Sequence, residues 1–186
     1  MRPPHKPARI SVGTGFWTLV ITYVATAILM IGLSEGVHHT TPLLLAPGLI
    51  WASFHDWQTH EIPDWCSAWI ACVGVGHSFY LYHSELWLNL ATGAIVLIVL
   101  WGLGEVYYRL KKTEGLGIGD AKLFAAGAVV LGPHLVLDMI CLASVGGIAA
   151  VLMRRYVQSS LDRGVAFGPF IAYAIFVLSF KEQTLL

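Results

Sequence analysis

The sequence predicts an all-α integral membrane protein, a polytopic bundle of six to seven transmembrane helices that forms one membrane domain over residues 1–186. Hydrophobic residues make up 56% of the chain and charged residues only 12%, whereas a soluble domain usually carries about 25% charged residues. Mean hydropathy is +0.70, and several apolar runs approach the ~20 residues that a helix needs to cross a bilayer. Because backbone polar groups at membrane depth must be satisfied internally, each span is predicted to be a helix.

Seven apolar segments divide the chain, at about 14–33, 43–55, 65–82, 86–106, 121–132, 135–153 and 165–180. The second and fifth are short, so each is either completed by residues of the adjoining loop or partly re-entrant. Residues 1–13 form a basic N-terminus. The segment 14–33 is longer than the apolar region of a usual signal peptide and has no clear A-x-A cleavage site after it. It is therefore expected to be a retained, additional first span before a core over residues 43–180.

Lysine and arginine indicate the orientation, because cytoplasmic loops of membrane proteins carry an excess of both. If the spans alternate from a cytoplasmic N-terminus, nearly all of the 11 Lys and Arg residues fall inside: Arg2, Lys6, Arg9, Arg109, Lys111, Lys112, Lys122, Arg154, Arg155 and Arg163. Only Lys181 then lies outside. The loops 56–64, 107–120 and 154–164 are therefore predicted to face the cytoplasm.

Composition gives no indication of a nucleic-acid partner, a metal or an organic cofactor. The formal net charge is zero, so no general attraction to nucleic acid follows. The cysteines, Cys66, Cys72 and Cys141, all fall inside apolar segments without a CxxC pair, so they are interpreted as small buried hydrophobes. No cofactor and no metal site is expected.

Asp56 ends an apolar segment at the predicted cytoplasmic boundary. Ionisable groups at membrane depth are candidate functional groups by default, which makes Asp56 a candidate site residue. The following Ile62-Pro63-Asp64 contains a proline that fixes a bend. Asp64 is well placed to cap the next helix, and capping is the preferred interpretation for it.

Asp120 follows three glycines at every second position, Gly115, Gly117 and Gly119. Glycine allows another backbone to come close and permits positive φ. One alternative is a glycine-rich loop that merely starts a helix capped by Asp120. A phosphate-binding loop is a second alternative, but the G-x-x-x-x-G-K-[ST] arrangement is absent. The short glycine motif is weak evidence by itself.

Asp56 and Asp120 are stronger evidence as a pair, because the orientation argument puts both at the cytoplasmic ends of spans. Two carboxylates at one depth can share a proton and activate a water for attack on a peptide carbonyl. Their mutual repulsion separates their titrations and leaves one acid and one base. The Asp-Thr-Gly and Asp-Ser-Gly signatures of soluble aspartic proteases do not occur, so an aspartyl protease here does not have the pepsin fold.

The order of these motifs resembles the type IV prepilin peptidase (prepilin leader peptidase) family, which are GxGD-type membrane aspartyl proteases. That family has an Asp shortly before an (I/L)-P-(D/N) element, then G-x-G-D-x-K-L, then a late P-F-G-P segment. This chain has Asp56 before Ile62-Pro63-Asp64, then Gly117-Ile118-Gly119-Asp120-Ala121-Lys122-Leu123, then Ala166-Phe167-Gly168-Pro169. The resemblance covers about 43–175. Ala166 stands where the family usually has proline.

The resemblance implies a membrane aspartyl endopeptidase, with Asp56 and Asp120 as the catalytic pair. It implies supporting roles for the other matching positions, Pro63, Gly117, Gly119, Lys122, Phe167, Gly168 and Pro169. The expected substrate is a membrane-anchored prepilin-like precursor (type IV pilin, pseudopilin or Flp-type), cut after its short basic leader at the cytoplasmic face of the inner membrane. Larger family members carry paired CxxC motifs in a domain that N-methylates the product. Their absence here resembles the compact, peptidase-only branch.

Two other functions are weighed against this one. Presenilin-like and signal-peptide-peptidase-like proteases also use G-x-G-D, but they have a Tyr-Asp first motif and a Pro-Ala-Leu third motif. Here His55 precedes Asp56, and Pro-Ala-Leu does not occur. A small proton- or cation-coupled transporter is the other alternative. Transport sites usually lie near the bilayer midplane, whereas both carboxylates are predicted to lie near one face. The sequence predicts nothing about oligomeric state.

Overall fold

A computed structural model describes residues 12–33, 40–81, 85–112, 115, 117–157 and 165–182, and structural statements below concern these residues. Within them the chain forms six helices and no strand: α1 (Val12–Leu33), α2 (Thr40–Thr59), α3 (Asp64–Leu81), α4 (Leu86–Lys111), α5 (Ile118–Val157) and α6 (Gly168–Glu182). Arg2, Lys6, Arg9 and Arg163, which enter the orientation argument, lie outside the described residues.

The all-α membrane fold predicted from the sequence is confirmed. Among the described residues three stretches are long and apolar enough to cross a membrane, Gly15–Leu33, Leu86–Lys111 and Ile118–Tyr156, and Gly168–Lys181 is a shorter apolar helix. Adjoining loop residues complete the second predicted segment, because α2 extends at both ends beyond 43–55. The predicted starts of the loops 56–64, 107–120 and 154–164 were wrong. Each loop begins later, because α2 continues to Thr59, α4 to Lys111 and α5 to Val157. α4 ends where Lys112 adopts a left-handed conformation.

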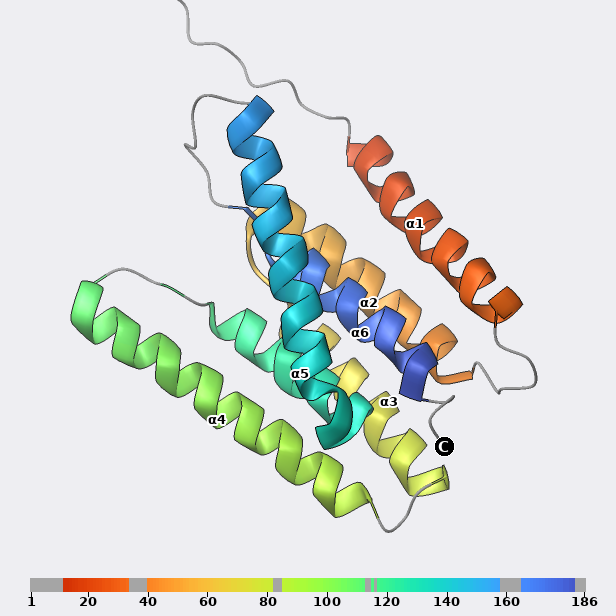
Figure 1. The fold of residues 1–186 in the computed structure, drawn as a ribbon. Coiled ribbons are helices and arrows are strands. Elements are labelled where there is room, and N and C mark those ends of the chain that lie inside the picture. The colour runs from red at the N-terminus through yellow and green to blue at the C-terminus, as the bar shows by residue number, and fades with distance from the viewer. Residues whose placement is uncertain are drawn as a thin grey trace, which may run out of the picture.

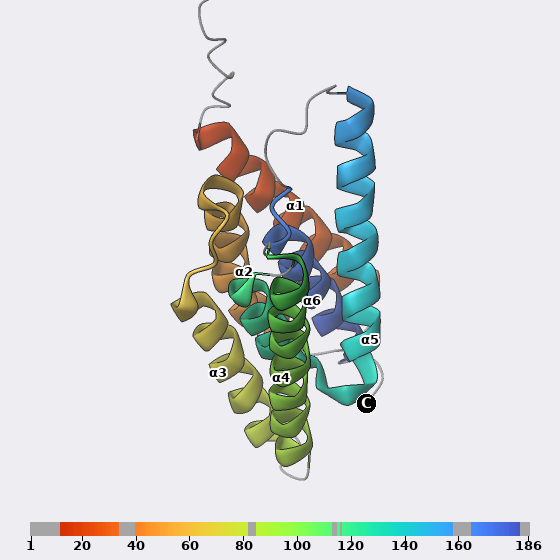
Figure 2. The same cartoon turned by 90° about the vertical axis from the view of Figure 1, so that its left-hand side faces the viewer.

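α5 contains two of the predicted spans, joined at a break. Gly132 has φ 65° and ψ −178°, which is outside the helical region, and glycine adopts positive φ without steric cost. Pro133 follows it, lacks a backbone N–H, and disfavours helix at the residue before it. The chain turns back at this point, and the two arms, 118–131 and 133–157, run in different directions (Figures 1 and 2). A Cβ at Gly132 would lie 2.7 Å from Oδ1 of Asn89.

α5 and α6 lie at the centre of the bundle. α5 packs against α3, α4 and α6, and α6 also packs against α2. The largest fully buried side chains of this core come from four helices: Leu45, Leu49, Ile70, Leu123, Val130, Met139, Ile171, Ile175 and Phe176. Large apolar side chains such as Ile28, Ile98 and Leu152 are exposed on the outside, as expected for a surface that faces lipid.

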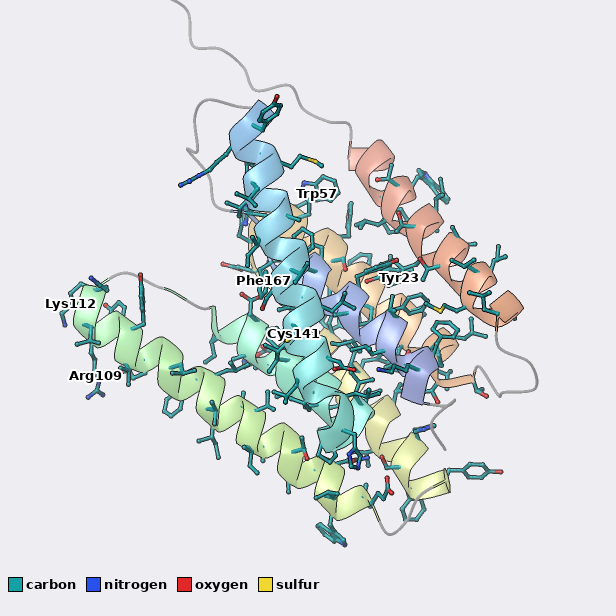
Figure 3. The ribbon with its side chains drawn as sticks, in the orientation of Figure 1. Tyr23, Trp57, Arg109, Lys112, Cys141 and Phe167 are labelled. Atoms are coloured by element: carbon teal, nitrogen blue, oxygen red, sulfur yellow. The ribbon has the colours of Figure 1, made fainter. Side chains whose placement is uncertain are left out.

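α1 lies beside α2 at one side of the molecule, and α4 lies at the other side (Figure 1). The main anchor of α1 is Tyr23. Its ring packs against the ring of Phe176, with 4.8 Å between the ring centroids, and its hydroxyl forms a 3.2 Å hydrogen bond with Oγ of Ser53. Figure 3 shows Tyr23 directed from α1 toward the core. Thr26 adds a 3.0 Å hydrogen bond to the hydroxyl of Tyr173. These contacts attach α1 to the part of the chain that carries the motifs.

Candidate active site

Asp56 lies near the C-terminal end of α2, and its side chain is buried, with 5% exposure. Its Oδ2 accepts a 2.8 Å hydrogen bond from the backbone N–H of Gly168, the first residue of α6. The first N–H groups of a helix have no partner within the helix, and the helix dipole favours a negative group there. The carboxylate of Asp56 therefore occupies the N-terminus of α6.

Glycine is the only residue type that fits at position 168 beside Asp56. A Cβ at Gly168 would lie 2.8 Å from Oδ2 of Asp56 and 3.0 Å from its Cβ. Pro169 stands in the first turn of α6, where its missing N–H removes no helical hydrogen bond. The Gly-Pro pair thus begins the helix and lets the carboxylate approach.

Phe167 fixes where α6 starts. Its carbonyl accepts hydrogen bonds from the N–H groups of Phe170 (3.0 Å) and Ile171 (3.3 Å). Its ring lies 6.1 Å from that of Phe124 and against Gly147, where a Cβ would come within 2.6 Å. Figure 3 shows Phe167 beside α5. Phe167 therefore ties the start of α6 to both arms of α5. The supporting role that the resemblance implies for Phe167 stays a prediction.

Asp120 is in the first turn of α5 and is half-buried. Its carboxylate is hydrogen-bonded to the backbone of Gly117, and the carbonyl of Gly117 accepts from the N–H of Ala121 at 3.2 Å. A Cβ at Gly119 would come within 3.3 Å of Cβ of Ile62, in the loop after α2. Gly119 thus allows the close approach of another backbone that the sequence predicted.

The loop between α2 and α3 is held in shape by its own polar groups. His60 has a positive φ of 57° and ends α2, with its N–H donating to the carbonyl of Asp56 at 2.9 Å. Nδ1 of His55 bonds the carbonyl of Glu61 at 2.9 Å and Oγ1 of Thr59 at 2.9 Å. This loop carries Ile62 onto Gly119, so it connects the Asp56 helix to the Asp120 turn.

A second contact joins the start of α3, directly after this loop, to α5. Nζ of Lys122 donates to Oδ1 of Asp64 at 2.7 Å, and both side chains are partly or largely exposed. Asp64 is the first residue inside α3, rather than the capping residue before it, so the capping interpretation is corrected: its carboxylate pairs with Lys122. We name the two contacts, Ile62 with Gly119 and Asp64 with Lys122, the α3–α5 clasp. They flank Asp120 on either side.

The structure brings the two candidate carboxylates to one end of the bundle from different helices. The charge of Asp56 acts on the carboxyl of Asp120, although they belong to α2 and α5. The two carboxyl groups therefore lie at the same end of the bundle, as the orientation argument predicted. Their catalytic role stays a prediction. No group of three or more His, Cys, Asp or Glu side chains that could hold a metal ion occurs in the described part of the chain.

Sequence reasoning missed the partner of Asp56 and the partner of Lys122. The resemblance gave Phe167, Gly168 and Pro169 a supporting role without a partner, although proline just inside a helix start is a recognisable signal. What no local signal gives is that this start faces Asp56, which is 112 residues away. The α1 contacts of Tyr23 were missed too, because one tyrosine in an apolar span has many possible orientations.

Comparison with known proteins identifies the family. The sequence model of the type IV leader peptidase family matches residues 43–152, which include both aspartates. The chain is 28% identical over 121 residues to the prepilin leader peptidase/N-methyltransferase of Escherichia coli, covering 63% of this chain and 52% of that protein. It is 29% identical over 161 residues to the protein of the same name from Aeromonas salmonicida, covering 83% and 54%.

A third relative of that name, from Burkholderia pseudomallei, is 30% identical over 131 residues, covering 69% of this chain and 42% of that protein. The chain spans about half the length of these curated relatives. No solved structure matches it significantly. The family match covers more than half of the chain and includes Ile62-Pro63-Asp64 and Gly117-Ile118-Gly119-Asp120. This protein therefore belongs to the type IV leader peptidase family.

Proposed function

We propose that this chain is a membrane aspartyl endopeptidase that removes the short basic leader from prepilin-like precursors at the cytoplasmic face of the inner membrane. The observation that carries the proposal is the convergence of buried Asp56 and half-buried Asp120 from separate helices at one end of the bundle. The relatives' name supports the class of substrate. Only the peptidase part of that name is taken over, because the matching family model is that of leader peptidases.

The chemistry needs one ionised and one protonated carboxyl. The ionised carboxylate takes a proton from a water molecule, whose oxygen attacks the carbonyl carbon of the scissile peptide. The protonated carboxyl donates a hydrogen bond to the carbonyl oxygen as negative charge develops on it. The tetrahedral intermediate then collapses, the C–N bond breaks, and the leaving nitrogen receives a proton from the pair. Asp56 and Asp120 supply both groups.

The distribution of positive charge supports the proposed orientation. The described Lys and Arg residues at the end of the bundle with the carboxylates are Arg109, Lys111, Lys112, Lys122, Arg154 and Arg155, and at the opposite end Lys181 pairs with Asp138 at 2.9 Å. An excess of positive residues marks the cytoplasmic side of a membrane protein. The carboxylates therefore face the compartment where a basic leader would emerge.

The test is cleavage of a membrane-anchored precursor by the purified chain in liposomes. Asp56→Asn and Asp120→Asn should each lower the cleavage rate by at least about 100-fold, since a positioned acid or base contributes 10²–10⁴-fold. Neither adds a charge, so both should insert normally. Asp138→Asn is the matched control. It removes a carboxylate from the same helix as Asp120, but at the opposite end of the bundle, and it should keep activity. Wild-type cleavage by either Asp56→Asn or Asp120→Asn would end the proposal.

A further inference from the structure

Tyr23 is a buried polar residue that the proposed chemistry does not use. It is 2% exposed, and among residues 15–33 of α1 it is the one residue that is buried. In the described part of the chain α1 packs against two helices, α2 and α6. Tyr23 contacts both of them, and Figure 3 shows its side chain directed from α1 into the bundle.

On α2, Tyr23 is hydrogen-bonded to Ser53. The two hydroxyl oxygens are 3.2 Å apart, and the hydroxyl of Ser53 also donates to the carbonyl of Leu49 at 2.8 Å. A serine hydroxyl has one proton, so Tyr23 is the donor in its bond with Ser53. Ser53 stands three residues before Asp56, and both residues are buried. Residues three apart are neighbours on a helix surface, so Tyr23 holds the face of α2 that carries Asp56.

On α6, the ring of Tyr23 lies against two aromatic rings. The centroid distances are 4.8 Å to Phe176 and 6.0 Å to Tyr173, and the ring of Tyr173 is edge-on at 87°. Aromatic pairs at such distances attract each other beyond the effect of buried area alone. One side chain of α1 thus contacts both α2 and α6 and restrains the position of one relative to the other.

The relative position of α2 and α6 determines the environment of Asp56. Its carboxylate accepts the 2.8 Å hydrogen bond from the N–H of Gly168, so one partner belongs to α2 and the other to α6. The fit is close, because a Cβ at Gly168 would lie within 3.0 Å of three atoms of Asp56. A small shift of α2 along α6 therefore weakens this bond.

We propose that Tyr23 is a positioning residue for Asp56. Its hydrogen bond to Ser53 and its ring contacts on α6 keep the carboxylate of Asp56 at the N-terminus of α6. The part of this inference that concerns cleavage rests on the proposed function. The part that concerns the hydrogen bond between Asp56 and Gly168 is measurable without a substrate.

Tyr23→Phe keeps the ring and removes only the hydroxyl. In precursor cleavage in liposomes it should lower kcat about threefold, the factor that corresponds to one interhelical hydrogen bond in a membrane. KM should stay unchanged, because the buried Tyr23 does not contact the substrate. Thr26→Val is the matched control. It removes the other α1 hydrogen bond, the 3.0 Å bond to Tyr173 of α6, which does not involve α2, and it should keep the wild-type kcat. Equal losses in the two variants would mean general attachment of α1 and would overturn the proposal.

Ser53→Ala removes the same hydrogen bond from the other side. It leaves the buried hydroxyl of Tyr23 without its acceptor, and a buried unpaired donor costs more than the loss of both partners. The value of kcat should therefore fall further in Ser53→Ala than in Tyr23→Phe, and the combined variant should recover part of that loss. Additive losses would show that the two residues act separately, against the proposal.

Hydrogen exchange of the Gly168 amide tests the positioning without a substrate. With isotope-labelled glycine, this amide is assigned by its disappearance in Gly168→Ala. It should exchange about threefold faster in Tyr23→Phe than in the wild type, and at the wild-type rate in Thr26→Val. A wild type that does not cleave the precursor would end the proposed function, and the exchange comparison would still decide the role of Tyr23. Equal exchange in Tyr23→Phe and the wild type would overturn that role and leave the proposed function standing.

Discussion

At the scale of single residues, the environment of Asp56 depends on the missing Cβ of Gly168. The carboxylate reaches the first N–H of α6 only because Gly168 has no Cβ. A buried carboxylate must have a partner, since burying an unpaired charge is costly. The backbone of α6 provides that partner without placing a second charge beside the pair.

Gly168→Ala should therefore damage activity more than stability. The new Cβ must move Asp56 or the start of α6, and a displacement of about 1 Å at a reacting group can cost about 100-fold in rate. The measurement is the precursor cleavage rate together with the thermal unfolding midpoint in detergent. Gly102→Ala is the control, because a Cβ at Gly102 would meet nothing within 4 Å. Equal activity of the two variants would contradict this account of Asp56.

The pair of carboxylates should also determine how the rate depends on pH. Cleavage needs one proton on the pair, so the rate should rise as the first carboxyl ionises and fall as the second one does. The resulting bell belongs to the pair and not to either residue. Residual activity in Asp56→Asn or Asp120→Asn should lack the bell. A profile of unchanged shape in both variants would assign the limbs to other groups.

At the scale of elements, two devices position the site: the α3–α5 clasp and the break in α5. The clasp fastens the loop after Asp56 to the turn that carries Asp120, by close packing at Gly119 and by the Asp64–Lys122 ion pair. The break lets one apolar stretch cross the bundle and return, so that α6 can start beside the end of α2.

The ion pair of the clasp should be a modest contributor. Exposed pairs are worth about 0.2–1 kcal/mol, so Asp64→Asn should keep most of the cleavage activity. A double-mutant cycle with Asp64→Asn, Lys122→Gln and the combined variant isolates the pairing energy. We expect a coupling of about 0.2–1 kcal/mol in unfolding free energy. If Asp64→Asn were inactive and Asp56→Asn active, the wrong member of the first motif would have been chosen.

The break at Gly132 should depend on its glycine. Gly132→Ala puts a side chain at positive φ and against Asn89, and positive φ with an extended ψ costs a non-glycine residue roughly 1–3 kcal/mol. Thermal unfolding in detergent should show at least that loss. Gly76→Ala is the matched control, since a Cβ at Gly76 would meet nothing within 4 Å. Equal stability of both variants would show that the turn needs no glycine.

At the scale of the whole molecule, the described positive residues gather where the carboxylates lie, and α1 is attached through few polar contacts. Association of helices in a membrane relies on close packing and interhelical hydrogen bonds. The Tyr23–Ser53 and Thr26–Tyr173 bonds serve this purpose for α1.

The charge distribution predicts which end of the molecule faces outward. In a variant without Cys66, Cys72 and Cys141, single cysteines are introduced at Arg155 and at Glu85, which are exposed near opposite ends. A membrane-impermeant maleimide added to intact cells should label Glu85→Cys and leave Arg155→Cys unlabelled until the cells are broken. The reverse pattern would place the carboxylates outside and contradict the proposed orientation.

The sequence by itself determined the features that each segment carries locally. Apolar runs report how long a stretch contacts lipid, so seven segments were predicted, and they correspond to the six helices once α5 is divided at Gly132. The Lys and Arg distribution and the three motifs predicted that Asp56 and Asp120 share one end of the molecule. The spacing of glycine before Asp120 predicted a close backbone approach, which Ile62 makes.

Only the tertiary structure decided which groups those features meet. Gly168 is 112 residues from Asp56, Lys122 is 58 residues from Asp64, and Tyr23 is 30 residues from Ser53. In a membrane nearly every face of a helix is apolar, so periodicity does not reveal which face meets which neighbour. Small residues and a few hydrogen bonds make that choice, and they do so only once all the helices are packed together.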